Sequence, residues 1–252
     1  MDRIVLQVSR AITSRLVEQG AEAVVVFGSR VRGDAHKESD IDIHAIGRGP
    51  RSKYRLERYR GFLISVYWMT ARQHRQAFKD PSQVGGIVSA WRNAVVIYDP
   101  RGIASAIKRD AKRWRWESLN KEADRWVAEE ITGWAEEVHR LIGNLQLGRR
   151  NAAAVVRSVL AIKMAPILAV HNRILYDTES QLWDLVSTRM GTKWAQIQSI
   201  ALGEGRHGFE DTCEAALQLY TTVAREVSHL LNHRQYQVVA HACEIAGHSL
   251  HD

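Results

Sequence analysis

The sequence contains little cysteine and shows no targeting segment. Among its 252 residues there are two cysteines, Cys213 and Cys243. Two cysteines do not make a disulfide framework in a chain of this size, which argues against the disulfide-rich secreted class. We recognise no signal peptide and expect no apolar run long enough to span a bilayer. These absences predict a soluble cytoplasmic protein that does not bind membranes.

Strand-like segments are missing from the second half of the sequence. Before about residue 118, short apolar runs typical of strands alternate with helical patterns, and after it only helical periodicity remains. The predicted fold class is therefore α+β. Residues 1–118 form an N-terminal domain with a small mixed sheet flanked by helices, and residues 119–252 form a C-terminal helical bundle. Two strand-like runs are expected within residues 24–46, one on each side of a polar segment, followed by a polar and strongly basic segment at 47–60 with a turn at Gly49-Pro50. Further strands are expected at 62–69 and 94–98. Helices are expected at 3–19, 71–78, 101–115, 119–146, 151–170, 179–188, 208–231 and 234–248, and Pro166 should kink the helix at 151–170.

Positive charge is concentrated in the first half. Residues 1–118 contain 22 Lys and Arg against 12 Asp and Glu, a formal charge of +10, and the remainder has 13 against 16, a charge of −3. A basic first half suits a polyphosphate ligand, whereas an acidic second half does not suit a nucleic-acid backbone. The alternative is that both halves simply present ordinary solvated surfaces.

The most informative stretch is VVVFGSRVRGDAHKESDIDIHAI, residues 24–46. Strand alternation places Asp40 and Asp42 on one face, where two carboxylates repel each other unless a cation lies between them. A hard divalent ion such as Mg²⁺ suits two such oxygens together with substrate phosphates. Gly28 allows close approach of the backbone to a phosphate, and Ser29 would begin a helix whose free N–H groups and dipole favour anions. The alternative is two strands joined by a polar loop.

The order of these features resembles the signature of the polymerase-β-like nucleotidyltransferase superfamily: Gly-Ser, about ten residues, then acid–apolar–acid. Further segments are similar to the aminoglycoside 4'-O-nucleotidyltransferases, the kanamycin nucleotidyltransferase family. These segments are VVIYDPRG, EEVHRLIGNLQLG and HNRILYDT. The resemblance covers residues 24 to 178, and the remaining residues add only general helicity.

The resemblance implies that the N-terminal domain binds nucleoside triphosphate and metal. Carried over by position, Ser29 and Arg32 contact the triphosphate of ATP, and Asp40 and Asp42 hold Mg²⁺. The family has a third carboxylate on the next strand, where this sequence has Ser65. Waters or an acid such as Glu57 would then complete the metal site, or the strand register is offset.

The resemblance also assigns roles in the helical domain, which would bind the acceptor and form a homodimer with shared active sites. Glu136 occupies the position of the catalytic base, and Arg140 that of a phosphate-binding lysine. Thr178 matches a nucleotide-contacting threonine. The alternative for Glu136 is a solvated acidic helix face, because Glu129 lies seven residues before it and shares that face.

The resemblance implies an antibiotic-resistance enzyme that transfers AMP from MgATP to an aminoglycoside hydroxyl, by analogy the 4' hydroxyl, and releases pyrophosphate. Two alternatives remain. One is a nucleotidyltransferase that acts on a protein or a nucleic acid, although the acidic helical half disfavours nucleic acid. The other is a non-catalytic nucleotide-binding protein, for which the missing third acid is the argument.

Overall fold

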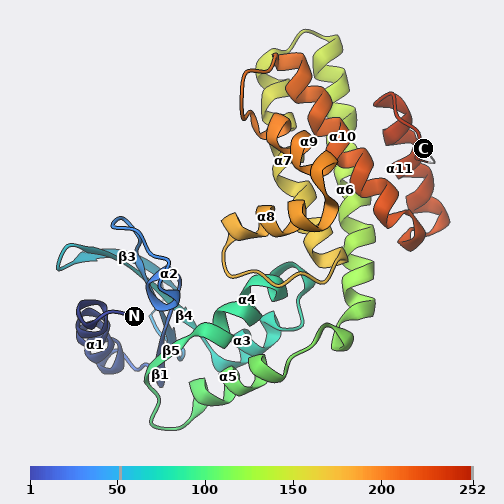
Figure 1. Cartoon of the computed structure of the whole chain (residues 1–252). Coiled ribbons are helices and arrows are strands. Elements are labelled where there is room, and N and C mark those ends of the chain that lie inside the picture. Colours follow the sequence, from blue (N-terminus) through green and yellow to red (C-terminus); the bar gives the residue numbers. More distant parts are fainter. Residues whose placement is uncertain (51–52, 251–252) are drawn as a thin grey trace. The chain divides into compact units, whose positions relative to one another are not determined.

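The computed structural model describes residues 1–50 and 53–250 and divides into two compact units. Unit 1 comprises residues 1–118 and unit 2 comprises residues 119–252. Unit 1 contains a five-stranded sheet with helices, and unit 2 has helices and no strand among its described residues (Figure 1). The predicted α+β fold class is confirmed.

The sheet of unit 1 is mixed. Its strands are ordered β3-β4-β2-β1-β5; β2 and β4 are parallel, and the other neighbouring pairs are antiparallel. The strand registers place Phe27 opposite Asp42, and Asp42 opposite Ser65. Paired residues point to the same face of a sheet, so these three side chains share one face. The strands are β1 (Ala23–Phe27), β2 (Ile41–Ile46), β3 (Tyr54–Tyr59), β4 (Phe62–Met69) and β5 (Val95–Tyr98).

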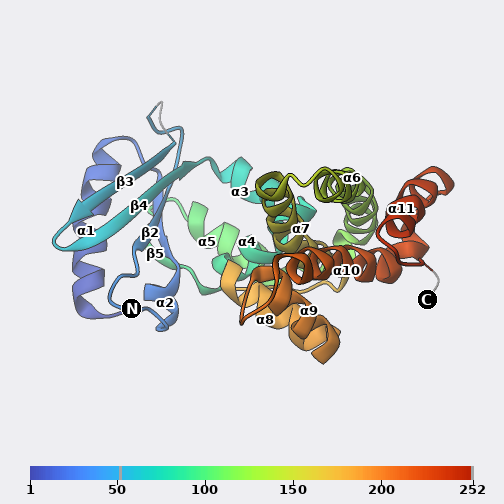
Figure 2. The same cartoon turned by 90° about the horizontal axis from the view of Figure 1, so that it is seen from above.

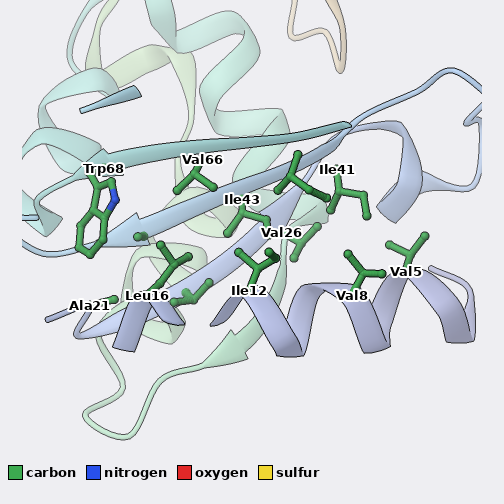
Figure 3. Close-up of a cluster of buried hydrophobic side chains, with 13 residues drawn as sticks. Val5, Val8, Ile12, Leu16, Ala21, Val26, Ile41, Ile43, Val66 and Trp68 are labelled. Carbon is green, nitrogen blue, oxygen red and sulfur yellow. The ribbon is translucent and has the colours of Figure 1, made fainter. Parts of the chain in front are cut away.

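Helix α1 (Arg3–Glu18) covers the opposite face of the sheet. Asp2 caps the helix, since its Oδ1 atom accepts a hydrogen bond from Val5 N at 2.8 Å. Apolar residues at helical spacing on α1 meet the alternate apolar residues of the strands, as Figure 3 shows. The labelled side chains of this core are Val5, Val8, Ile12, Leu16, Ala21, Val26, Ile41, Ile43, Val66 and Trp68.

The face that carries Asp42 is only partly covered. The one-turn helix α2 (Ser29–Arg32) follows β1, and α3 (Ala71–Ala77) and α4 (Pro81–Asn93) bring buried side chains onto Phe27 and His44. Helix α5 (Ile103–Arg113) packs on α3 and α4. Towards β3 the same face is open, and Tyr54, Leu56, Leu63 and Tyr67 are there 53%, 51%, 42% and 39% exposed.

Unit 2 is a helical bundle. Its helices are α6 (Asn120–Gln146), α7 (Arg150–His171), α8 (Glu179–Met190), α9 (Thr192–Leu202), α10 (Phe209–Val227) and α11 (His233–Ile245). Helix α6 packs along α7, and α10 packs on both α7 and α9. Figure 2 shows α6, α7 and α10 side by side, with α11 adjoining α6.

Two sequence expectations concern helix α7. It runs continuously through Pro166, where the proline removes one backbone hydrogen bond, and the expected kink there stays a prediction. By length and composition it could also cross a membrane, with a mean hydropathy of 1.9 over its most apolar window. The prediction that no such run exists was therefore wrong. Within unit 2 this helix packs against α6, α8, α9 and α10, and 56% of that window is buried.

Among the described strands and α-helices, three were not predicted, each for a local reason. Strand β3 reads YRLERY, and its charged residues Arg55 and Glu57 hide the strand pattern. Helix α4 contains Gly85 and Gly86, which are weak helix formers. Helix α9 is short and lies between two glycines that resemble loop signals. The basic segment at 47–60, for which only a turn at Gly49-Pro50 was predicted, contains strand β3; residues 51–52 of this segment lie outside the described part.

Candidate functional site

The turn after β1 brings the backbone against the Asp42 carboxylate. Gly28 has φ +81°, a left-handed conformation that favours glycine, and a Cβ atom placed on it would lie 2.1 Å from Asp42 Oδ2. The other carboxylate oxygen, Oδ1, accepts a hydrogen bond from Ser65 Oγ at 2.7 Å. One oxygen of Asp42 is therefore held by a hydrogen bond from the neighbouring strand, and the other lies against the backbone of the turn.

Asp40 lies at the end of a loop that Arg30 holds in place. The Arg30 Nη2 atom donates hydrogen bonds to the carbonyls of Ser39, at 2.7 Å, and Lys37, at 3.1 Å. The same guanidinium lies 5.1 Å above the ring of Phe62 at the start of β4. Arg30 was not selected from the sequence, and it sets the path of the backbone into Asp40.

The two predicted metal-binding carboxylates interact in the structure. Burial raises the pKa of the Asp42 carboxyl, the hydrogen bond from Ser65 opposes this rise, and the charge of Asp40 adds to it. The positive charge of Arg32 lowers the pKa of Asp42, and Arg32 also pairs with Asp34 at 3.1 Å. A buried carboxylate beside a second one is stabilised by a cation.

The residues present fit a hard divalent ion such as Mg²⁺. They offer carboxylate oxygens, and a Mg²⁺ ion commonly takes one or two protein carboxylates and completes its shell with water and substrate phosphates. No group of three or more His, Cys, Asp or Glu side chains in residues 1–50 and 53–250 is arranged to hold a metal ion. Asp40 and Asp42 would therefore act as a pair of ligands.

Glu57 does not complete this pair. It lies opposite Ile64 in the β3–β4 register, on the face covered by α1, and it pairs with Arg15 at 3.0 Å and Arg55 at 3.3 Å. The suggestion that Glu57 joins the metal site was wrong, because strand alternation turns its side chain away from Asp42. The register places Ser65 beside Asp42, so Ser65 does occupy the expected position.

The anion-binding role expected from a helix dipole at Ser29 is weaker than predicted. Helix α2 is only four residues long and ends at Gly33. A single turn aligns few peptide dipoles, so its macrodipole is small. What the turn contributes is close backbone approach at Gly28 and the nearby side chains of Ser29 and Arg32.

A cluster of imidazole and aromatic rings lies behind Asp42. The ring of His44, two residues further along β2, lies 4.5 Å from that of Phe27 and 5.6 Å from that of His74 between ring centroids. Trp91 Nε1 donates to His74 Nδ1 at 3.3 Å. Burial lowers the pKa of His44 to about 3, with the charge of His74 adding to the effect, and lowers that of His74 to about 4. Both rings are neutral at physiological pH.

Glu136 and Arg140, predicted for the acceptor side, lie on α6 in unit 2. Arg140 bridges two acids, with 2.7 Å from Nη2 to Glu136 Oε1 and 2.8 Å from Nη1 to Glu137 Oε1. The side chain of Glu136 is 69% exposed, whereas that of Glu137 is 17% exposed. Exposure fits both the catalytic and the solvated-face interpretations, so the role of Glu136 stays a prediction.

Thr178, the predicted nucleotide contact, is the N-cap of α8. Its Oγ1 atom accepts a hydrogen bond from Gln181 N at 3.1 Å. The capping bond explains a threonine at this position without a nucleotide. Of the predicted site residues, the structure therefore gathers Gly28, Ser29, Arg32, Asp40 and Asp42 around one turn in unit 1, and places Glu136, Arg140 and Thr178 in unit 2.

Residues 9–87 match the family described as nucleotidyltransferase domain. This stretch runs from α1 into α4 and contains the Gly28 turn and both aspartates. Over this stretch the chain is similar to a nucleotidyltransferase domain. That part of the predicted resemblance is confirmed, and the aminoglycoside family remains a prediction.

Among solved structures, the chain is similar to a nucleotidyltransferase-like protein from Exiguobacterium sibiricum. The two share 10% sequence identity with a TM-score of 0.57, over 95% of this chain and 79% of the other. At this identity the likeness concerns the fold alone. No curated protein matches this chain significantly.

The close approach at the turn predicts different outcomes for two glycines. Gly28→Ala and Gly191→Ala both place an alanine in an extended conformation at positive φ, with φ 81° and ψ −170° at Gly28 and φ 88° and ψ −177° at Gly191, which costs about 1–3 kcal/mol each. Only Gly28→Ala also displaces Asp42, since nothing lies within 4 Å of an added Cβ at Gly191. We expect Gly28→Ala to lose at least about 1 kcal/mol more than Gly191→Ala in urea denaturation. Equal losses would show that the Asp42 carboxylate moves freely.

The buried imidazole of His74 predicts loss of stability in acid. In the unfolded chain His74 takes up a proton near pH 6.5, whereas burial lowers its pKa to about 4 in the folded chain. The free energy of unfolding therefore decreases as the pH falls between these two values. His74→Gln retains an acceptor for Trp91 and does not titrate. Between pH 7 and pH 5, the unfolding free energy of the wild-type protein should therefore fall by about 2 kcal/mol more than that of His74→Gln. His207→Gln, which removes an exposed imidazole, is the control, and the effect of His74→Gln should exceed it.

Proposed function

We propose that this chain is an enzyme that transfers AMP from MgATP to a hydroxyl group of an aminoglycoside, with release of pyrophosphate. The observation that carries the nucleotide half of this proposal is the Gly28 turn lying against Asp42 inside a nucleotidyltransferase domain. The acceptor half rests on the segments around Glu136 and Thr178 that resemble the aminoglycoside family.

In this proposal the residues of unit 1 bind and orient the nucleotide. Asp40 and Asp42 would hold Mg²⁺, which when bound neutralises phosphate charge and polarises the α-phosphate. Ser29 and Arg32 would contact the triphosphate, and the +10 charge of residues 1–118 favours a polyanionic ligand. Fixed donors and charges of this kind need little reorganisation during the reaction.

In unit 2, Glu136 would remove the proton from the acceptor hydroxyl. The oxygen then attacks the α-phosphorus in line, a P–O bond to that oxygen forms, and the bond to the leaving pyrophosphate breaks. Arg140 would bind phosphate, and the acidic balance of residues 119–252 would attract a polycationic aminoglycoside. The active enzyme is proposed to be a homodimer, and Thr178 is proposed to contact the nucleotide.

One observation favours a protein acceptor as the second candidate. Tyr54, Leu56, Leu63 and Tyr67 lie exposed on the face of the sheet that carries Asp42 and Ser65. Exposed apolar groups that gather beside a site are typical of protein-binding surfaces. Such an acceptor would receive AMP on a side-chain hydroxyl.

The metal role of the aspartates is tested by transfer itself. The protein is incubated with MgATP and a panel of aminoglycosides, and products are examined by mass spectrometry for the addition of one AMP. We expect Asp42→Asn and Asp40→Asn to reduce transfer by more than about 100-fold. Asp42→Asn should not destabilise the fold, because an amide at position 42 removes a buried charge and still accepts the hydrogen bond from Ser65.

Asp110→Asn is the matched control, since Asp110 pairs with Arg75 on the surface of unit 1 at 3.2 Å. It should transfer AMP at the wild-type rate. Normal turnover in the Asp42 variant would contradict the metal role, and labelling of protein in place of every aminoglycoside would favour the second candidate.

The general base is tested by two neighbouring acids. Glu136→Gln should lower kcat by about 100- to 10,000-fold with little change in ATP affinity, because the carboxylate acts on the acceptor. Glu137→Gln should be mild by comparison. Both variants break one ion pair with Arg140, so their folding stabilities should be similar. If only Glu137→Gln is inactive, the base is the less exposed acid; if neither is impaired, Glu136 has no catalytic role.

A further inference from the structure

Ser65 lies next to the two carboxylates that are proposed to bind metal, and it is hydrogen-bonded to one of them. It lies opposite Asp42 in the parallel β2–β4 pair, is 9% exposed, and donates its hydroxyl hydrogen bond to Asp42 Oδ1 at 2.7 Å. A hydrogen bond to a charged acceptor at this length is of the strong kind. The bond also opposes the rise in the pKa of Asp42 caused by burial.

The orientation of Asp42 is set by a hydrogen bond on one side. Ser65 donates to Oδ1, and on the other side the backbone of Gly28 lies so close to Oδ2 that no side chain would fit between them. The Ser65 bond therefore favours one orientation of the carboxylate. A ligand that is already oriented loses less conformational freedom when it binds a cation.

The same geometry limits how many cations the protein can bind. A neutral hydroxyl that donates to Asp42 does not supply a negative charge, and Glu57 points to the opposite face, where it pairs with Arg15 and Arg55. Within residues 1–50 and 53–250 there is no set of three or more candidate metal-binding side chains. Two divalent ions close together repel each other strongly unless several carboxylates surround them.

We infer that Ser65 is a positioning residue that fixes Asp42 and restricts this site to a single divalent cation, the one that accompanies the nucleotide. The inference rests on the proposed nucleotidyl transfer and adds the metal stoichiometry to it. It makes two separable claims: the hydroxyl supports binding of the cation, and the missing charge at position 65 sets the number of cations.

The experiment counts Mn²⁺ ions bound to the full chain by electron paramagnetic resonance, in the presence of a non-hydrolysable ATP analogue. Wild-type protein should bind one Mn²⁺ per chain. Ser65→Ala should still bind one, with affinity weaker by about 10- to 100-fold, whereas Ser65→Thr should restore most of it by returning the hydroxyl. Ser65→Asp should bind a second Mn²⁺. Thermal melting of each variant checks that it is folded.

The outcomes separate the claims. Two ions on wild-type protein would overturn the inference, and so would a Ser65→Ala variant that binds Mn²⁺ as tightly as wild type. A folded Ser65→Asp variant that still binds one ion would show that charge at position 65 does not set the number. If the wild-type protein does not bind the analogue at all, the proposed function is overturned. If it binds the analogue together with two ions, only the inference about the number of ions is overturned.

Discussion

The site in unit 1 depends on the contact between the Asp42 carboxylate and the backbone of Gly28. The antiparallel pairing of β1 with β2 brings them together, and only a residue without a side chain allows it. Because the carboxylate is partly withdrawn from water beside Asp40, it is more stable when a proton or a cation neutralises it. In the proposed function a proton and a metal ion would therefore compete for the same oxygens, and metal binding would be coupled to pH.

The two faces of the sheet differ: one forms the apolar core, and the other carries the candidate site. The face under α1 is a continuous apolar core, and the charges of Arg15, Arg55 and Glu57 are confined to its β3 side. The other face has neutral imidazole and indole rings packed behind Asp42. Since those rings carry no charge, they do not offset the negative charge of the aspartates. Compensation comes from Arg32 and from whatever ligand binds.

Much of the fold can be predicted from the local pattern of apolar residues, and the site in unit 1 can be predicted from its Gly-Ser and Asp-x-Asp motif. The alternation of Asp40, Asp42 and the isoleucines between them predicts which side faces α1, because a period of two is unambiguous. Strand β3 was not predicted because its inward positions, Arg55 and Glu57, are charged. They pair with each other, and Glu57 also pairs with Arg15, which is 42 residues away in the sequence. The imidazole pair of His44 and His74 depends on tertiary packing, although His44 shares a strand face with Asp42. Positions in unit 2 were predicted by resemblance, and periodicity alone does not distinguish Glu136 from Glu137 as the chemically useful acid.

The hydrogen bonds from Arg30 to the loop before β2 affect which substitutions that loop can accept. Arg30 binds the carbonyl oxygens of Lys37 and Ser39, and every residue type supplies a carbonyl. Two side chains of the loop also hold its backbone, since Ser39 Oγ accepts a hydrogen bond from His36 N at 3.0 Å and His36 Nδ1 accepts one from Glu38 N at 3.2 Å. Substitutions elsewhere in the loop can therefore change the surface that it presents, while the path of the backbone into Asp40 is kept.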